Sequence, residues 1–159
     1  MLAPTVKIVR KGDARKALAR VGKALAGPSH VKVGFPSGTG SDIIMRAVWN
    51  EFGTAGGASG GGWGGPVPER PFFRNAMRDG VDGYRKIAKS DAPKVLRGDM
   101  MMTTSLSRLG LKGQGDIQKS IGSNIPPPNA PLTVALKGSS ATLIDTGEMR
   151  QRVTFLVED

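Results

Sequence analysis

One short stretch of the chain carries a pattern of residues that could perform hydrolysis. Asp145-Thr146-Gly147 follows the apolar pair Leu143-Ile144, which places an aspartate in a tight turn. Two such aspartates brought close together share one proton, because neighbouring like charges do not both ionise, and the pair can then activate a water molecule. The chain holds one copy of this pattern, so the chemistry would require a homodimer.

The surroundings of Asp145 favour a structural role instead. The turn resembles the active-site signature of aspartic proteases, but those enzymes usually place a small residue after the glycine, and Glu148 stands there in this chain. Residues 148–159 also contain no glycine-bearing strand that would brace such a loop. A turn or helix cap, in which Asp145 or Thr146 accepts backbone N–H groups, is the more economical interpretation.

Composition removes most other catalytic and cofactor chemistry. The chain has no cysteine, which excludes disulfides, cysteine-based zinc sites, iron–sulfur clusters and thiol nucleophiles. Its single histidine, His30, stands beside a turn with no nucleophile-elbow pattern, and we expect it at the surface. The glycine-rich stretch lacks the Gly-Lys-Ser/Thr ending of a phosphate loop. We therefore expect no enzyme, with no catalytic residue, cofactor or metal.

Positive charge dominates the chain and is concentrated near its start. There are 23 Lys and Arg residues against 13 Asp and Glu residues, a net charge of +10, which suggests an acidic partner. Residues 1–32 hold eight of the basic residues and one acid. A predicted amphipathic helix over 13–25 carries Arg15, Lys16, Arg20 and Lys23. These side chains form either a solvated face or a face that meets an anion or partner.

Hydrophobic spacing predicts an α+β fold within a single domain of 159 residues. Strands are expected near 4–10, 31–35 and 153–157, and helices near 13–25, 41–52, 73–88, 93–121 and 133–137. Because strands and helices do not alternate regularly, we expect a small antiparallel sheet packed with two longer helices. The basic N-terminal helix and long Gly/Pro-rich loops complete this fold.

Two of the predicted helices carry specific expectations. The helix over 41–52 is predicted to be capped by Ser41 or Asp42, with one apolar face formed by Ile44, Ala47, Val48 and Phe52. The helix over 93–121 is predicted to begin at Pro93, which suits a first turn. The three glycines inside it indicate a kink or a close approach to another backbone: Gly110, Gly113 and Gly115.

Two segments are dominated by glycine or proline. Residues 53–65 contain eight glycines, with Trp63 as the only large side chain. This segment is either a surface loop or a loop that orders only against a neighbouring subunit, with Trp63 as its anchor. Residues 125–131 are expected to be extended, as a stiff linker or as a ligand for a proline-recognising domain.

Four segments, in a fixed order, carry a family resemblance. They are residues 31–36, residues 47–54 with Asn50-Glu51-Phe52-Gly53-Thr54, residues 67–74 with Pro68-Glu69-Arg70-Pro71-Phe72, and residues 143–150 with the Asp-Thr-Gly turn. Together they resemble the neck proteins of tailed bacteriophages. This is the head–tail connector and tail-completion group, which includes virion-morphogenesis proteins of Mu-like phages. The resemblance spans residues 31 to 158.

The resemblance implies a structural virion protein without a reaction or cofactor. It implies one neck or tail-completion domain over 1–159, with an inserted loop at 53–65, that assembles as a six-fold or twelve-fold ring. The ring would join the DNA-filled head to the tail, between portal-adaptor and tail-tube or terminator proteins. A tail terminator that caps the tail tube is the alternative. DNA would pass through without sequence recognition. The protein would be made in the host bacterial cytoplasm and reside in the virion, without a membrane partner.

A ring requires a heterologous interface, in which two different patches meet. The residues that we expect there are Trp63, Pro68, Arg70, Pro71, Phe72, Arg74, Pro127 and Pro128. Arg70 and Arg74 would fork to carboxylates of a neighbour. Phe72 is out of phase with the apolar stripe that follows it, so it either caps the core or enters a partner. Asn50, Glu51 and Asp145 are expected to cap helices and turns within one subunit.

A basic nucleic-acid-binding module is the alternative from another class. In it, Arg15, Lys16, Arg20 and Lys23 would contact phosphates, and affinity would fall steeply with salt. Residues 1–32 contain no Phe, Tyr or Trp on which bases could stack, which argues against it.

Overall fold

A computed structural model describes residues 13–55 and 66–159 of the protein. The elements are α1 (Ala14–Leu25), β1 (His30–Gly34), α2 (Ser41–Phe52), α3 (Phe72–Leu96), α4 (Met102–Ile121), α5 (Pro131–Lys137), α6 (Glu148–Arg152) and β2 (Thr154–Glu158). The two strands pair as an antiparallel sheet, so the fold is α+β, as predicted. The strand expected near residues 4–10 lies outside the described residues, as does Trp63.

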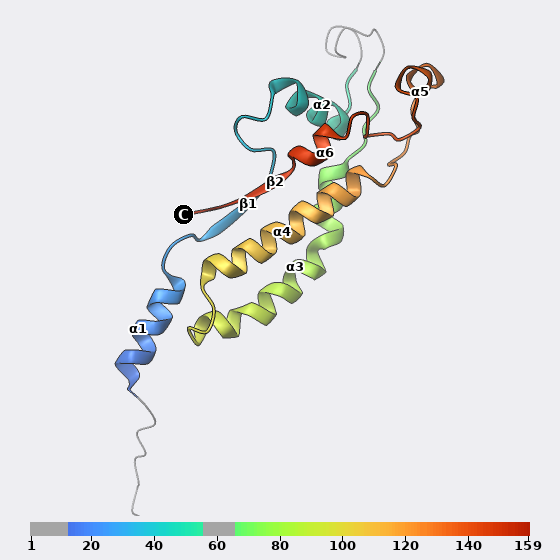
Figure 1. Cartoon of the computed structure of the whole chain (residues 1–159). Coiled ribbons are helices and arrows are strands. Elements are labelled where there is room, and N and C mark those ends of the chain that lie inside the picture. Colours follow the sequence, from blue (N-terminus) through green and yellow to red (C-terminus); the bar gives the residue numbers. More distant parts are fainter. Residues whose placement is uncertain (1–12, 56–65) are drawn as a thin grey trace, which may run out of the picture.

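A long hairpin of α3 and α4 is the frame of the molecule (Figure 1). The sheet packs on α4, with Val33 opposite Phe155 in its register. Helices α2, α5 and α6 gather at one end of the hairpin, and α1 extends from the other end, beside the turn that joins α3 to α4 (Figure 1). Different helices therefore surround the two ends of the α3–α4 hairpin.

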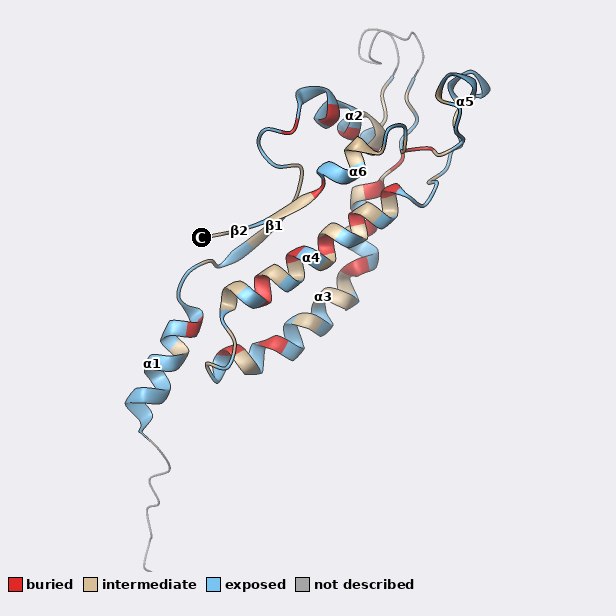
Figure 2. Cartoon of the chain, in the orientation of Figure 1, coloured by how far each residue is buried: buried red, intermediate tan, exposed pale blue. Residues whose placement is uncertain are grey.

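The core is small and lies where α2, α3, α4 and the segment before β2 meet. Its buried residues are Ala47, Phe72, Ala76, Ile117, Ile121, Leu143 and Val153. Figure 2 shows buried positions along α3 and α4 and on α2, while α1 and α5 are mostly exposed. Helix α1 buries only Ala24, and α5 and α6 bury no residue. Several helices thus leave most of their surface uncovered.

The long helix α3 does not end where the sequence suggested. It continues through Pro93 to Leu96, so the predicted helix start at Pro93 is wrong. The turn comes instead at Gly98, whose φ of 74° is left-handed and whose N–H donates to the carbonyl of Val95. Glycine adopts this conformation without a steric penalty. Pro131 is a second correction, because it begins α5 rather than ending an extended run.

Helix α2 is rotated relative to the prediction. Gly40, rather than Ser41 or Asp42, occupies the N-cap position. The buried face consists of Ile43, Ala47 and Glu51, one residue around the helix from the expected face. The other members of the predicted face are exposed: Ile44 by 36%, Val48 by 42% and Phe52 by 63%. The cause is Glu51, whose buried carboxylate binds the start of α3.

Two glycines of α4 leave room for the sheet to pack against this helix. A Cβ atom on Gly110 would lie 2.3 Å from Cδ2 of Phe155, and one on Gly113 would lie 3.1 Å from Cγ2 of Val33. The predicted close approach is therefore made by strand side chains rather than by another backbone. Gly115 faces open space, with nothing within 4 Å of such a Cβ.

We predict that Gly110→Ala lowers the free energy of unfolding by about 1–3 kcal/mol, because Phe155 must move. The matched variant Gly115→Ala should raise it by up to about 1 kcal/mol, because alanine is the better helix former. Urea denaturation of both variants measures the difference. A Gly110→Ala protein as stable as the Gly115→Ala protein would contradict the close packing of Phe155 on Gly110.

A polar contact joins α3 to α4 midway along the hairpin. The hydroxyl of Tyr84 donates to Oδ2 of Asp116 at 2.9 Å, and Nζ of Lys112 pairs with the same carboxylate. Burial, followed by the hydrogen bond and charge of Asp116, raises the pKa of Tyr84 above its usual value of 10.0. Tyr84 is the only tyrosine in the chain, so its ionisation can be observed alone.

We predict that the near-ultraviolet absorbance of the phenolate appears well above pH 10 in the folded protein. Because tyrosine in the unfolded chain ionises near pH 10, the folded state should lose stability as the pH rises above that value. Asp116→Asn should lower the pKa of Tyr84, since it removes the negative charge. A pKa near 10 that does not change in this variant would contradict the contact.

Candidate functional site

The motif segments converge where α2 ends and α3 begins. We call this cluster the motif junction; it comprises Asn50, Glu51, Glu69, Arg70 and Arg74 together with the carbonyls of Pro127 and Pro128. Three of the four segments that carry the family resemblance therefore lie at one place: residues 47–54 and 67–74 form the junction, and residues 143–150 lie beside it.

The carboxylate of Glu51 caps α3 from a different helix. Its oxygens accept the backbone N–H groups of Phe73 at 2.8 Å and Arg74 at 3.0 Å. The residue at the N-cap position of α3 is Pro71, which has no side-chain donor or acceptor of its own. Glu51 thus satisfies N–H groups that the helix leaves unpaired and places negative charge at its positive end. The prediction that Glu51 caps within one subunit is confirmed.

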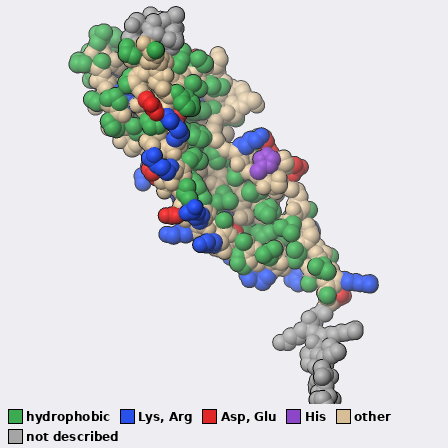
Figure 3. Space-filling view, turned by 180° about the vertical axis from the view of Figure 1, so that it is seen from behind, with side chains coloured by type: hydrophobic (Ala, Val, Ile, Leu, Met, Phe, Trp, Pro, Cys, Tyr) green, Lys and Arg blue, Asp and Glu red, His purple; other side chains and the backbone are tan. Residues whose placement is uncertain are grey.

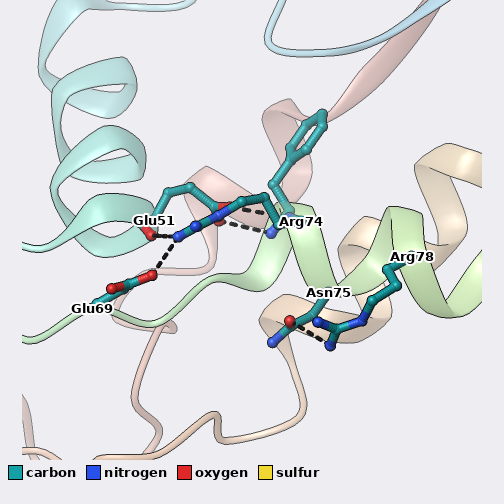
Figure 4. Close-up of polar contacts among 6 residues, drawn as sticks. Glu51, Glu69, Arg74, Asn75 and Arg78 are labelled. Carbon is teal, nitrogen blue, oxygen red and sulfur yellow. Dashed lines mark hydrogen bonds and ion pairs between the residues drawn. The ribbon is translucent and has the colours of Figure 1, made fainter.

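Arg74 is held between two carboxylates of its own chain (Figure 4). Its Nε donates to Glu51 at 2.9 Å, and its Nη2 donates to the backbone carbonyl of Glu51 and to the Glu69 carboxylate. These hydrogen bonds raise the pKa of Arg74. The guanidinium also lies 5.1 Å from the ring centroid of Phe52. Within the chain Arg74 binds Glu51 and Glu69, and its side chain is about half exposed, so its contact with a neighbour's carboxylates stays a prediction.

Arg70 is buried and connects three segments. Only 4% of its surface is exposed, its backbone N–H donates to the carbonyl of Asn50 at 2.6 Å, and its Nε donates to the carbonyl of Pro127 at 2.9 Å. Its Nη2 donates to the carbonyl of Pro128 at 3.3 Å. Burial lowers the pKa of Arg70. The prediction that it reaches a neighbouring subunit is wrong, because its donors are directed at carbonyls within the chain.

The remaining predicted interface residues divide into two groups. Phe72 is 1% exposed and belongs to the core, so it does not enter a partner. Pro68, Pro127 and Pro128 are exposed beside the junction, and Pro71 is half-buried. They stay predictions. The described residues on either side of 56–65 are joined, since the N–H of Thr54 donates to the carbonyl of Val67 at 2.9 Å.

The Asp-Thr-Gly segment forms the turn that leads into α6. Gly147 has a left-handed φ of 82°, and Oγ1 of Thr146 accepts the N–H of Glu148 at 3.4 Å. The structural interpretation of this segment is therefore confirmed for Thr146. Asp145 is exposed and lines a pocket of about 140 Å³ with Arg46, Asn50 and Lys137.

The basic residues that the sequence singled out lie away from the motif junction. Arg15, Lys16, Arg20 and Lys23 are exposed on α1, at the opposite end of the α3–α4 hairpin (Figure 1). Sequence reasoning missed the basic residues in the last turns of α3, which pack beside α1. The high density of Lys and Arg over residues 85–97 can be seen in the sequence, but the contact between α1 and α3 cannot.

Comparison with protein-family models, curated proteins and solved structures finds no match to this chain. None of the helices in residues 13–55 and 66–159 is long and apolar enough to cross a membrane. Over the same residues, no group of three acidic or histidine side chains is arranged to hold a metal ion.

We predict that Glu51→Ala lowers the free energy of unfolding by about 2–4 kcal/mol, because it leaves two helix N–H groups and a guanidinium without their partner. Glu51→Gln should cost less, since its amide oxygen still accepts a hydrogen bond. Glu69→Gln removes the charge from an exposed contact of the same arginine but keeps an acceptor, and it should cost less than about 1 kcal/mol. Equal losses for Glu51→Ala and Glu69→Gln in chemical denaturation would refute the capping role.

Proposed function

We propose that this protein is a structural component of the neck of a tailed bacteriophage. It assembles as a homo-oligomeric ring and joins the DNA-filled head to the tail. A tail terminator that caps the tail tube is the alternative within the same class. The order and spacing of the motif segments motivate this proposal, and the surface at one end of the molecule supports it.

That surface is an apolar end formed by two helices. On α2, Ile44, Met45, Val48 and Phe52 are 36–63% exposed, and on α5 both Leu132 and Leu136 are 71% exposed. Hydrophobic side chains also gather at this end in the space-filling view (Figure 3). Each Å² of apolar surface left in water costs about 25 cal/mol, and large exposed apolar patches usually mark interfaces.

The charge balance of the apolar end favours a protein partner. Residues 36–55 and 124–153 contain four basic and four acidic residues, so this end is close to neutral. The two exposed stripes lie on different helices, which gives the chain two distinct apolar patches. A ring needs such a pair, because one patch of each subunit meets a different patch of the next.

The motif junction supports the same role in another way. Its charged groups are satisfied within the chain, and they stiffen the connection between α2, α3 and the proline-rich loop. Contact helices that are held rigidly within the subunit lose less conformational freedom when subunits associate. The exposed prolines beside the junction, Pro68, Pro127 and Pro128, lie next to this base and stay candidates for the contact.

We predict that light scattering or sedimentation of the full chain detects a ring of six or twelve subunits, and that Val48→Asp shifts the protein to the monomer. A buried charge without a partner would prevent contact through α2. The control is Leu111→Asp on α4, where the leucine is 64% exposed and lies outside the apolar end. This variant should assemble like the unmodified protein.

Two results would count against assembly through the apolar end. One is a protein that stays monomeric at every concentration tested. The other is a pair of aspartate variants that weaken assembly equally, since that would implicate charge in general rather than α2.

A further inference from the structure

Positive charge is segregated at the end of the molecule opposite the apolar end. Residues 13–27 and 85–99 contain nine basic and three acidic residues. The fold brings these two segments together, since a Cβ atom on Gly98 would lie 3.0 Å from Cβ of Arg20. We call the surface of α1 and the last turns of α3 the basic end.

The acids of the basic end neutralise only part of its charge: Lys16 lies 3.9 Å from Asp13, and Lys94 lies 3.9 Å from Asp91. Asp91 is fully buried and binds Arg108 at 2.7 Å, so its charge is not on the surface. Asp13 accepts the backbone N–H of Arg15 as the N-cap of α1. Asp99 is exposed and pairs with Arg97 at 2.9 Å.

Five cations of the basic end have no carboxylate partner. Across residues 13–55 and 66–159, no carboxylate lies within 4.0 Å of the charged groups of Arg15, Arg20, Lys23, Lys86 and Lys89. Residues 1–12 and 56–65 contain no acid at all, so they supply no partner either. All five residues are exposed. The chain thus keeps these charges unpaired in water, which favours an external polyanion.

We propose that the basic end binds the phosphate backbone of duplex DNA without reading its sequence. Duplex DNA carries one negative charge per about 1.7 Å of its axis, so a rigid array of cations gains from counterion release at many positions. Residues 13–34 and 85–101 contain no Phe, Tyr or Trp. The basic end therefore offers no platform for stacking the bases of a single strand, and the duplex is the better fit.

This inference rests on the proposed function and deepens it. In a neck ring, subunits contact one another through protein surfaces while DNA passes along the axis. The apolar end meets protein and the basic end meets phosphates, so α1 is directed toward the channel. The α3–α4 hairpin keeps these two surfaces apart (Figure 1).

The test measures binding of a short random-sequence DNA duplex to the full chain by fluorescence anisotropy at several salt concentrations. We expect log K to fall with log[salt] with a slope of about −3 to −5, since each neutralised phosphate contributes about −0.9. The triple variant Arg15→Gln, Arg20→Gln and Lys23→Gln should reduce the magnitude of this slope by about 2–3.

A matched control removes the same charge from the apolar end. Arg46→Gln, Lys137→Gln and Arg150→Gln also subtract three cations, and this variant should keep the slope of the unmodified protein. Circular dichroism verifies that both variants are folded. If the two variants reduced the magnitude of the slope equally, the effect would come from net charge alone, and the proposal would be overturned. Binding that does not depend on salt, or the absence of binding, would also overturn it.

Anionic lipid vesicles distinguish the second possible polyanion. Binding to vesicles without binding to DNA would overturn the proposal in favour of a lipid surface. Failure of the inference also differs from failure of the proposed function. A ring that does not bind DNA would remove only the inference. A monomer that binds DNA with the expected slope would instead favour the nucleic-acid-binding module over the neck protein.

Discussion

The carboxylate of Glu51 is the contact on which the arrangement of the molecule depends. This carboxylate is buried and caps α3, and the side chain of Arg74, in the first turn of that helix, donates to the same carboxylate. Because Glu51 faces inward, Ile43 and Ala47 are buried with it, and Ile44, Val48 and Phe52 are turned outward. One polar contact thus determines which apolar residues of α2 stabilise the core and which are left exposed.

Two further contacts fix the rest of the molecule around α3 and α4: Arg70 holds the proline-rich loop, and the glycines of α4 hold the sheet. Arg70 binds the carbonyls of the proline-rich loop and joins it to the end of α2. Gly110 and Gly113 let the two strands approach α4, so a sheet of only two strands is supported along one face. The result is a long body with little core whose ends differ in charge: one is close to neutral, and the other is basic. Both ends expose large apolar side chains, with Leu18 and Leu96 at the basic end. That separation suits a subunit that meets protein on one side and a polyanion on the other.

The sequence predicted the local elements better than the contacts among them. Alternation at residues 31–35 and 153–157 identified both strands of the sheet, and periodicity identified every described helix except α6, whose five residues are too few to form a periodic pattern. The face of α2 was mistaken because it was chosen from the spacing of apolar residues alone. The partners that draw Glu51 inward are backbone N–H groups, which leave no trace in the sequence. Arg70 was assigned to a neighbour for a similar reason, since carbonyl acceptors carry no signature. The end of α3 was misplaced because Pro93 was interpreted as the first turn of a new helix, where proline is favoured, whereas the structure holds it inside α3 and turns at Gly98.

Electron microscopy of particles from a phage whose copy of this gene carries a stop codon tests the proposed function most directly. DNA-filled heads beside free tails of normal length are the result expected for a protein that joins the two. Abnormally long tails would assign the chain to the terminator instead, because tube growth would not be halted. Intact, infectious virions would contradict a role in the neck.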